Sequence, residues 1–137
     1  MNLTTLGLIA ISFVTTPYMW GGSNAMKGLD CSGFVQKVLE EVGIDPPGDQ
    51  TAQGLYNHFV KAGKQCQIGP DSLLFFGKSP SRITHIAIAL TDEVMIEAGG
   101  GDSTTKTLED AIKKEARVRI VPINKRKDLL DAFKITY

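Results

Sequence analysis

The stretch that most constrains this chain is Leu29-Asp30-Cys31-Ser32-Gly33-Phe34-Val35, where a glycine-rich loop leads into an apolar helical pattern. Asp30 can cap the helix, because its carboxylate can accept a hydrogen bond from an unpaired N–H group of the first turn. Cys31 then lies in that turn, where unpaired amides and the helix dipole favour negative charge. This position favours a thiolate and therefore a nucleophilic cysteine. The alternative is a small buried apolar residue, which is the usual state of a free cysteine, and the stretch alone leaves both open.

Glycines surround this stretch, and the chain has a second cysteine outside it. We expect the glycines to leave room around the sulfur of Cys31; they are Gly21, Gly22, Gly28 and Gly33. Cys66 lacks both the glycines and the cap, and two cysteines are too few for a disulfide framework. No group of Cys and His residues has the spacing of zinc ligands, so we expect no metal and no cofactor.

Length and charge narrow the class of protein. The 137 residues suit one domain with one core, so we expect residues 1–137 to form a single domain. Lys and Arg together number 15, as do Asp and Glu, so no net charge favours nucleic acid or an anionic membrane surface. The basic residues between 113 and 127 are expected to form a solvated face, with a weak contact to an anionic polymer as the alternative.

An uncharged apolar run extends from Leu3 to Val14 and is followed by Pro17. It is shorter than the ~20 residues that a membrane span needs. No Lys or Arg precedes Lys27 and no A-x-A cleavage site follows, so the run lacks the pattern of a secretory signal. We therefore expect a buried helix over about 2–15, synthesis in the cytoplasm and no membrane partner.

Helical periodicity dominates the first half of the chain, and strand alternation dominates the second half. Apolar faces predict helices at about 31–42 and 51–62, and Thr107 with Asp110 predicts a capped helix at 107–115. Strands are expected at 73–76, 83–90, 94–98 and 118–121, and a weak helical turn at 127–133. This order predicts an α+β fold, in which N-terminal helices pack on a central antiparallel sheet of about five strands.

A nucleophilic cysteine needs a base, and the chain has two histidines. His58 lies in the middle of a predicted helix, where we expect a partly exposed residue without a catalytic role. His85 lies in the strongest predicted strand, and alternation places it on one face with Ala87 and Ala89. These small side chains leave a shallow surface on which the helix that starts at Cys31 could dock, so His85 is the candidate base.

Glu97 and Tyr18 are candidates for the other polar groups of such a site. A hairpin around 91–92 brings Glu97 opposite or diagonal to His85 on the same face of the sheet. Its carboxylate could accept the second imidazole N–H and stabilise the imidazolium; the alternative is an edge-strand charge that faces water. The Tyr18 hydroxyl could donate to an oxyanion together with the Cys31 N–H, and the alternative is a ring that packs under its loop.

Five short segments follow one another between residues 18 and 98. They are Tyr18-x-Trp20-Gly21-Gly22, Asp30-Cys31-Ser32-Gly33-Phe34-Val35, Leu74-Phe75-Phe76-Gly77, His85-Ile86-Ala87-Ile88 and Met95-Ile96-Glu97-Ala98. Their combination resembles the NlpC/P60 family of cell-wall cysteine peptidases. The resemblance implies a papain-like α+β fold with Cys31 as nucleophile, His85 as base and Glu97 as the group that orients His85. It implies an oxyanion or substrate role for Tyr18 and, in members that require it, binding of a free L-alanine amine by Asp30, Ser32 and Tyr18.

The resemblance also implies a substrate, namely peptidoglycan stem peptides that are cut between γ-D-glutamate and a diamino acid. Two features depart from the family pattern: the position of Glu97 is often His, Asn or Gln, and the segment from Gly22 to Cys31 is one residue longer than usual. A single bare domain is similar to compact phage-encoded lysins or tail enzymes that act at the cell wall, and we expect a monomer.

Two other functions are compatible with the same residues. One is a Cys/His amidase or an acyl or peptidyl transferase that acts on another substrate. The other is a catalytically idle phage tail or wall-binding protein that keeps the fold.

Overall fold

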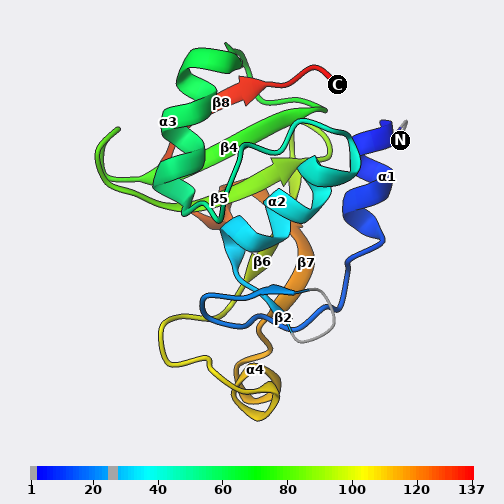
Figure 1. Ribbon diagram of the computed structural model, residues 1–137, viewed down its shortest axis with the longest axis vertical. Helices are drawn as coiled ribbons and strands as arrows, with labels where there is room; N and C mark the ends of the chain where they lie inside the picture. Colours follow the sequence, from blue (N-terminus) through cyan, green and yellow to red (C-terminus); the bar gives the residue numbers. More distant parts are fainter. Residues whose placement is uncertain (1–2, 25–27) are drawn as a thin grey trace.

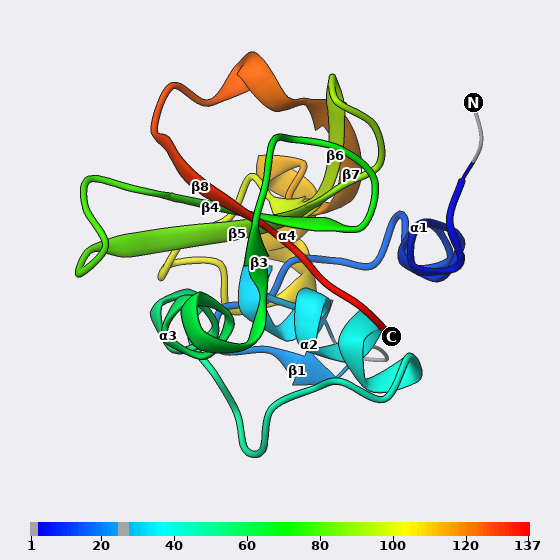
Figure 2. The same cartoon turned by 90° about the horizontal axis from the view of Figure 1, so that it is seen from above.

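The computed structural model describes residues 3–24 and 28–137. In this part of the chain, α2 (Cys31–Glu41) and α3 (Ala52–Ala62) cover one face of a six-stranded antiparallel sheet (Figure 1). Figure 2 shows α1 (Thr5–Ile11) beside α2 at the margin of the molecule, and Figure 1 places α4 (Leu108–Lys114) beyond the ends of β6 and β7. The predicted α+β class, with helices layered on an antiparallel sheet, is confirmed.

The sheet has the strand order β3-β8-β4-β5-β6-β7, and each pair of neighbours is antiparallel. Its strands are β3 (Lys64–Gln65), β4 (Ser72–Gly77), β5 (Ile83–Ala89), β6 (Val94–Gly99), β7 (Arg117–Pro122) and β8 (Leu129–Lys134). A separate ribbon of β1 (Ser23–Asn24) and β2 (Gly28–Leu29) lies just before α2. The sequence predicted about five strands and named four strand segments, and the two strands of the six-stranded sheet outside those segments are the short edge strand β3 and the strand β8.

Threonine or aspartate caps each α-helix in the described residues. The side chain of each cap accepts a hydrogen bond from the N–H group three residues later, which satisfies one unpaired amide of the first turn. The caps are Thr4, Asp30, Thr51 and Thr107. The predicted capping box is present at α4, where Asp110 also accepts from the Thr107 N–H. The Asp30 cap fixes where α2 begins, and with it the position of Cys31.

The first helix is shorter than predicted. Its predicted start at Asn2 lies outside the described residues, and it ends at Ile11 rather than near Thr15. The Ser12 hydroxyl donates to a carbonyl of the last turn at 2.6 Å, and such side-chain bonds compete with helix continuation. Leu8 is 57% exposed, so the helix is not covered on most sides as expected. No helix of the described residues is long and apolar enough to cross a membrane.

The last strand corrects a second prediction. The segment 129–134 is strand β8, whereas the sequence predicted a weak helical turn at 127–133. A helix of so few residues is unstable by itself because its nucleation is unfavourable, while pairing with β4 gives the backbone groups partners. Phe133 of β8 also packs edge-on against Phe75, with 6.0 Å between the ring centroids. Contacts distant in sequence therefore determine this element.

The central strands β4, β5 and β6 are buried on both faces, and α2 lies on the face opposite to the predicted one. Branched side chains of β5 meet the helix, in a core that includes Ile86, Ile88, Phe34, Val35, Val38 and Leu39. The face of Ala87 and Ala89 is covered by a second, smaller cluster with Leu74, Phe76, Met95 and Ile123. The prediction that α2 docks on the alanine face was therefore wrong. The larger isoleucine side chains supply the apolar area that an amphipathic helix buries.

Phe75 provides a test of this core, because its side chain is fully buried between Tyr56 and Phe133. We expect Phe75→Ala to lower the free energy of unfolding by about 3–5 kcal/mol in urea titrations, through lost burial and the cavity left behind. The control is Val60→Ala on the exposed side of α3, with an expected change of about 0.5 kcal/mol or less. Similar losses in the two variants would contradict the assignment of Phe75 to the core.

Candidate active site

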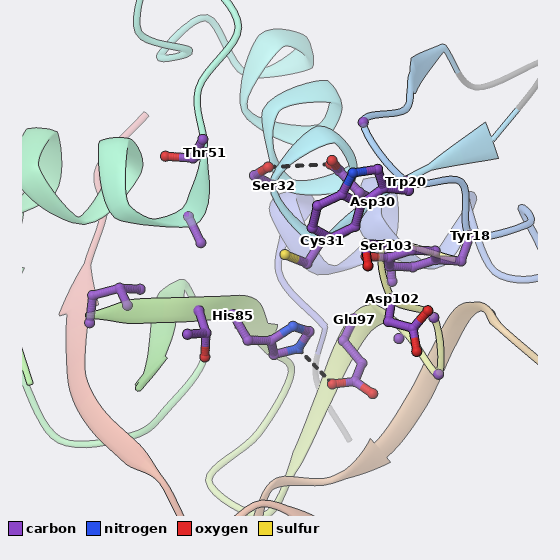
Figure 3. A pocket seen from close by; sticks show the side chains of 18 of the residues that line it. Tyr18, Trp20, Asp30, Cys31, Ser32, Thr51, His85, Glu97, Asp102 and Ser103 are labelled. Atoms are coloured by element: carbon purple, nitrogen blue, oxygen red, sulfur yellow. Dashed lines mark hydrogen bonds and ion pairs between the residues drawn. The ribbon is translucent and has the colours of Figure 1, made fainter. Parts of the chain in front are cut away.

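The pairing between strands β5 and β6 ends close to the point where α2 begins. Within the described residues they pair at Ile88–Ile96 and Ala89–Met95, and no pairing is formed nearer to His85. His85 and Glu97 lie on these parted segments, and the first turn of α2 carries Cys31 to the same place (Figure 3). The three predicted catalytic residues therefore come together, although α2 packs on the other face of the sheet.

His85 lies between Cys31 and Glu97 (Figure 3). Its Nε2 is 2.8 Å from Glu97 Oε1, so Nδ1 is the ring nitrogen left for Cys31. Burial would lower the pKa of His85, but the contacts with Cys31 and Glu97 outweigh burial and raise this pKa to about 9. The imidazole is therefore protonated at neutral pH, as a thiolate–imidazolium pair requires.

Glu97 is held on both of its carboxylate oxygens. Oε1 faces His85, and Oε2 lies 3.0 Å from both Nε and Nη2 of Arg119. Burial would raise the pKa of Glu97, but the hydrogen bonds and charges of His85 and Arg119 lower it to about 2. Glu97 is only 3% exposed, so the alternative of a charge that faces water is wrong.

Asp30 and Ser32 line the cleft beside Cys31. Asp30 Oδ1 accepts from the Gly33 N–H at 2.7 Å and from the Ser32 hydroxyl at 3.2 Å. Burial raises the pKa of Asp30, and these two bonds offset that effect only in part. Ser32 is itself buried, so its hydroxyl supports the Asp30 carboxylate. Asp30 thus both caps α2 and presents a carboxylate to the cleft.

The Tyr18 ring lines the same cleft and is covered by the backbone at Gly101. A Cβ atom on Gly101 would overlap the ring, so only glycine lets the loop approach so closely. Burial and the negative charges of Cys31 and Asp30 raise the pKa of Tyr18 above its ordinary value. The hydroxyl therefore stays protonated and can donate. The ring packs under a loop and also lines the cleft, so the packing of Tyr18 is confirmed and its oxyanion role stays a prediction.

The cleft has a volume of about 830 Å³, which lies within the usual range of ligand-binding pockets. Its acidic lining residues are Glu97 of β6 and three aspartates from the loops before α2 and α3 and after β6, namely Asp30, Asp49 and Asp102. Its basic lining residues come from β7 and the segment that follows; they are Arg119, Lys125 and Arg126. Charges of both signs therefore meet any ligand in this cleft.

Sequence reasoning missed Arg119 and misread the glycines near Cys31. Arg119 was assigned to a solvated basic face, but β7 places it directly opposite Glu97 on β6. The alternation of β7 could have suggested this contact if the pairing of β6 with β7 had been known. A Cβ atom on Gly33 would overlap the Gly22 carbonyl oxygen, so these glycines let two backbone segments touch rather than leave room around the sulfur.

The other histidine and cysteine lie away from this cleft. His58 is half-buried, with its ring against Phe59, and lines a separate shallow pocket beside α3. Cys66 packs against the smaller core cluster of the sheet. Among the described residues, no three side chains of His, Cys, Asp or Glu are grouped as they would be to hold a metal ion.

The raised pKa of His85 predicts that stability falls at alkaline pH. The folded pKa of about 9 exceeds the ordinary value of 6.5, so folding strengthens proton binding. This stabilisation is complete below about 6.5 and is lost as pH rises through about 9. We expect the urea midpoint to fall across this range, and to fall less in His85→Gln. Equal falls in both proteins would contradict the assignment of the shift to His85.

Known proteins are similar to this chain over most of its length. The profile of the NlpC/P60 family matches residues 15–121. The bifunctional muramidase/DL-endopeptidase CwlT of Bacillus subtilis is 36% identical over 80 residues, which are 58% of this chain and 24% of that protein. The probable peptidoglycan endopeptidase LytE of the same species is 28% identical over 111 residues, which are 81% of this chain and 31% of that protein. The chain thus spans less than a third of the length of these relatives.

Solved structures show the same fold. The NlpC/p60 domain of the peptidoglycan hydrolase SagA has a TM-score of 0.71 and 25% identity, over 98% of this chain and 100% of that chain. The peptidoglycan hydrolase RipB from Mycobacterium tuberculosis has a TM-score of 0.68 and 23% identity, over 96% and 64%. The family profile covers well over half of the chain, and its range contains Cys31, His85 and Glu97. This chain therefore belongs to the NlpC/P60 family.

Proposed function

We propose that this domain is a cysteine peptidase that hydrolyses amide bonds in the stem peptides of peptidoglycan. The observation that carries the proposal is the placement of Cys31 at a helix start, facing a buried histidine that Glu97 holds in its protonated form. The names of the relatives, a DL-endopeptidase and a peptidoglycan endopeptidase, support the substrate class. This substrate places the site of action at the bacterial cell wall.

Two steps follow from this geometry. The Cys31 thiolate attacks the scissile carbonyl carbon, while the Cys31 N–H and the Tyr18 hydroxyl donate to the developing oxyanion. His85 Nδ1 gives its proton to the leaving amine, which departs and leaves a thioester on Cys31. Neutral His85 then takes a proton from water as the water oxygen attacks the thioester. The acid product leaves, and the thiolate and imidazolium are restored.

Removal of the nucleophile tests this mechanism. We expect Cys31→Ala to reduce the clearing of purified peptidoglycan by about 10³-fold or more, because no acyl-enzyme can form. Cys66→Ala is the matched control and should retain activity, since Cys66 lies outside the cleft. Equal clearing by wild type and Cys31→Ala, from clean preparations, would contradict the proposal. Transfer products without free stem fragments, when an amine acceptor is added, would favour the transferase alternative.

We also propose that the bond cut lies between γ-D-glutamate and a diamino acid, in peptides with a free L-alanine amine. The support comes from the resemblance at Tyr18, Asp30 and Ser32 together with the chemistry of the cleft. Asp30 directly precedes the proposed nucleophile Cys31 and presents a carboxylate to the cleft. A cationic amine is a suitable partner for this carboxylate. The phage origin and the monomeric state stay predictions.

The charge of Asp30 can be removed without loss of the helix cap. Asparagine also caps helices well, so Asp30→Asn should leave α2 intact and remove only the attraction for the amine. For a stem peptide with a free N-terminal alanine, we expect KM to rise by about tenfold or more, with little change in kcat. For the N-acetylated peptide, the two proteins should have the same KM. A free-amine peptide whose KM does not change would rule out this role of Asp30.

A further inference from the structure

We propose that Arg119 is a positioning residue of the active site, which holds Glu97 on its outer oxygen and offsets part of its charge, so that His85 can release its proton to the leaving amine. The proposal rests on the proposed peptidase function for the identity of that amine. The contact between Arg119 and Glu97 itself is independent of any substrate.

The two oxygens of Glu97 have separate partners. Arg119 places both Nε and Nη2 on Oε2, each at 3.0 Å, and leaves Oε1 free for His85 at 2.8 Å. With its outer oxygen held, the carboxylate cannot rotate away from the imidazole. The planar guanidinium suits this contact, because it directs two donors to one point in a fixed geometry. Arg119 therefore determines the orientation of a group that touches His85, without touching Cys31 itself.

The backbone at the end of β6 lies close to this ion pair, at Gly99, which is the last residue of the strand, and at Gly100. A Cβ atom on Gly99 would overlap Glu97 Oε2 and lie 2.9 Å from Arg119 Nη2. A Cβ atom on Gly100 would lie 3.1 Å from Arg119 Nη1, and Gly100 has a φ of +83°, which favours glycine. The missing side chains of Gly99 and Gly100 thus leave the space that the guanidinium of Arg119 occupies. A surface arginine that pairs by chance does not require such a space.

The charge of Arg119 has a chemical consequence for His85. A buried glutamate beside a histidine strongly stabilises the imidazolium, which makes the imidazolium a weaker acid. The cation of Arg119 neutralises part of the Glu97 charge and limits this effect. Glu97 therefore still orients the ring, while His85 retains the acidity that protonation of the leaving amine requires.

Titration of His85 by nuclear magnetic resonance tests the charge effect without any substrate. The chain has two histidines, so His58 serves as an internal reference in the full-length protein. We expect the pKa of His85 to rise by about one unit in Arg119→Met and to fall in Glu97→Gln, while that of His58 stays constant. Since no substrate is present, this result holds or fails separately from the proposed peptidase activity. A His85 titration that is unchanged or lowered in Arg119→Met would overturn the proposal.

A double-mutant cycle on stem-peptide hydrolysis tests the positioning effect. Arg119→Met should lower kcat by about tenfold with little change in KM, and Arg119→Lys should restore part of the loss. In the Glu97→Gln background, Arg119 is an unpaired cation beside the imidazolium, so adding Arg119→Met should raise kcat. If Arg119 has only a structural role, the losses in kcat of the two single variants add in the double variant. If Arg119 binds substrate, Arg119→Met raises KM both in the wild-type protein and in Glu97→Gln. Either result would overturn the proposal.

Gly99→Ala gives a second route that leaves every charged group in place. The added methyl group should displace the Arg119–Glu97 contact and lower kcat in the same way as Arg119→Met. Gly69→Ala is the matched control, because a Cβ atom there meets no atom within 4 Å. We expect Gly69→Ala to keep wild-type kcat. A Gly99→Ala protein that is folded by circular dichroism and fully active would contradict the proposed role of this ion pair.

Discussion

The contact between the first turn of α2 and the loop that carries Gly22 is the constraint on which the rest of the site depends. Two backbones approach so closely at Gly22 and Gly33 that a side chain on Gly33 would overlap the Gly22 carbonyl oxygen. Asp30 ends the loop and caps the helix in the same place. Backbone contacts and a helix cap thus fix the position of Cys31, the proposed nucleophile.

Buried charges next to this contact are coupled to one another. His85, Glu97 and Arg119 form a continuous chain of opposite charges, and the first two are almost completely buried. Removing one member of such a chain leaves its neighbour charged and without compensation in a medium of low polarity. The protonation state of His85 therefore depends on Cys31 at the start of α2 and on Glu97 of β6, which Arg119 of β7 holds. Electrostatics and sheet pairing cannot be separated in this site.

Residues of the site could be predicted from the sequence where their placement depends on a short stretch of chain. The cap and the helix start defined Cys31, and strand alternation with a short hairpin placed Glu97 within reach of His85. Arg119 was not predictable, because its contact depends on which strand pairs with β6. Strand β8 and the face on which α2 docks were misjudged for the same reason, since both depend on partners far away in the sequence. Local patterns thus predicted the chemistry better than they predicted the packing.

The central claim is that His85 maintains Cys31 as a reactive thiolate, and alkylation by iodoacetamide at pH 6 tests it most directly. The measurement uses the Cys66→Ser protein, so that Cys31 is the one cysteine of the sequence that can react. We predict that Cys31 reacts at least about tenfold faster than a model thiol, and that adding His85→Gln removes the difference. A rate equal to that of the model thiol, unchanged by His85→Gln, would contradict the claim.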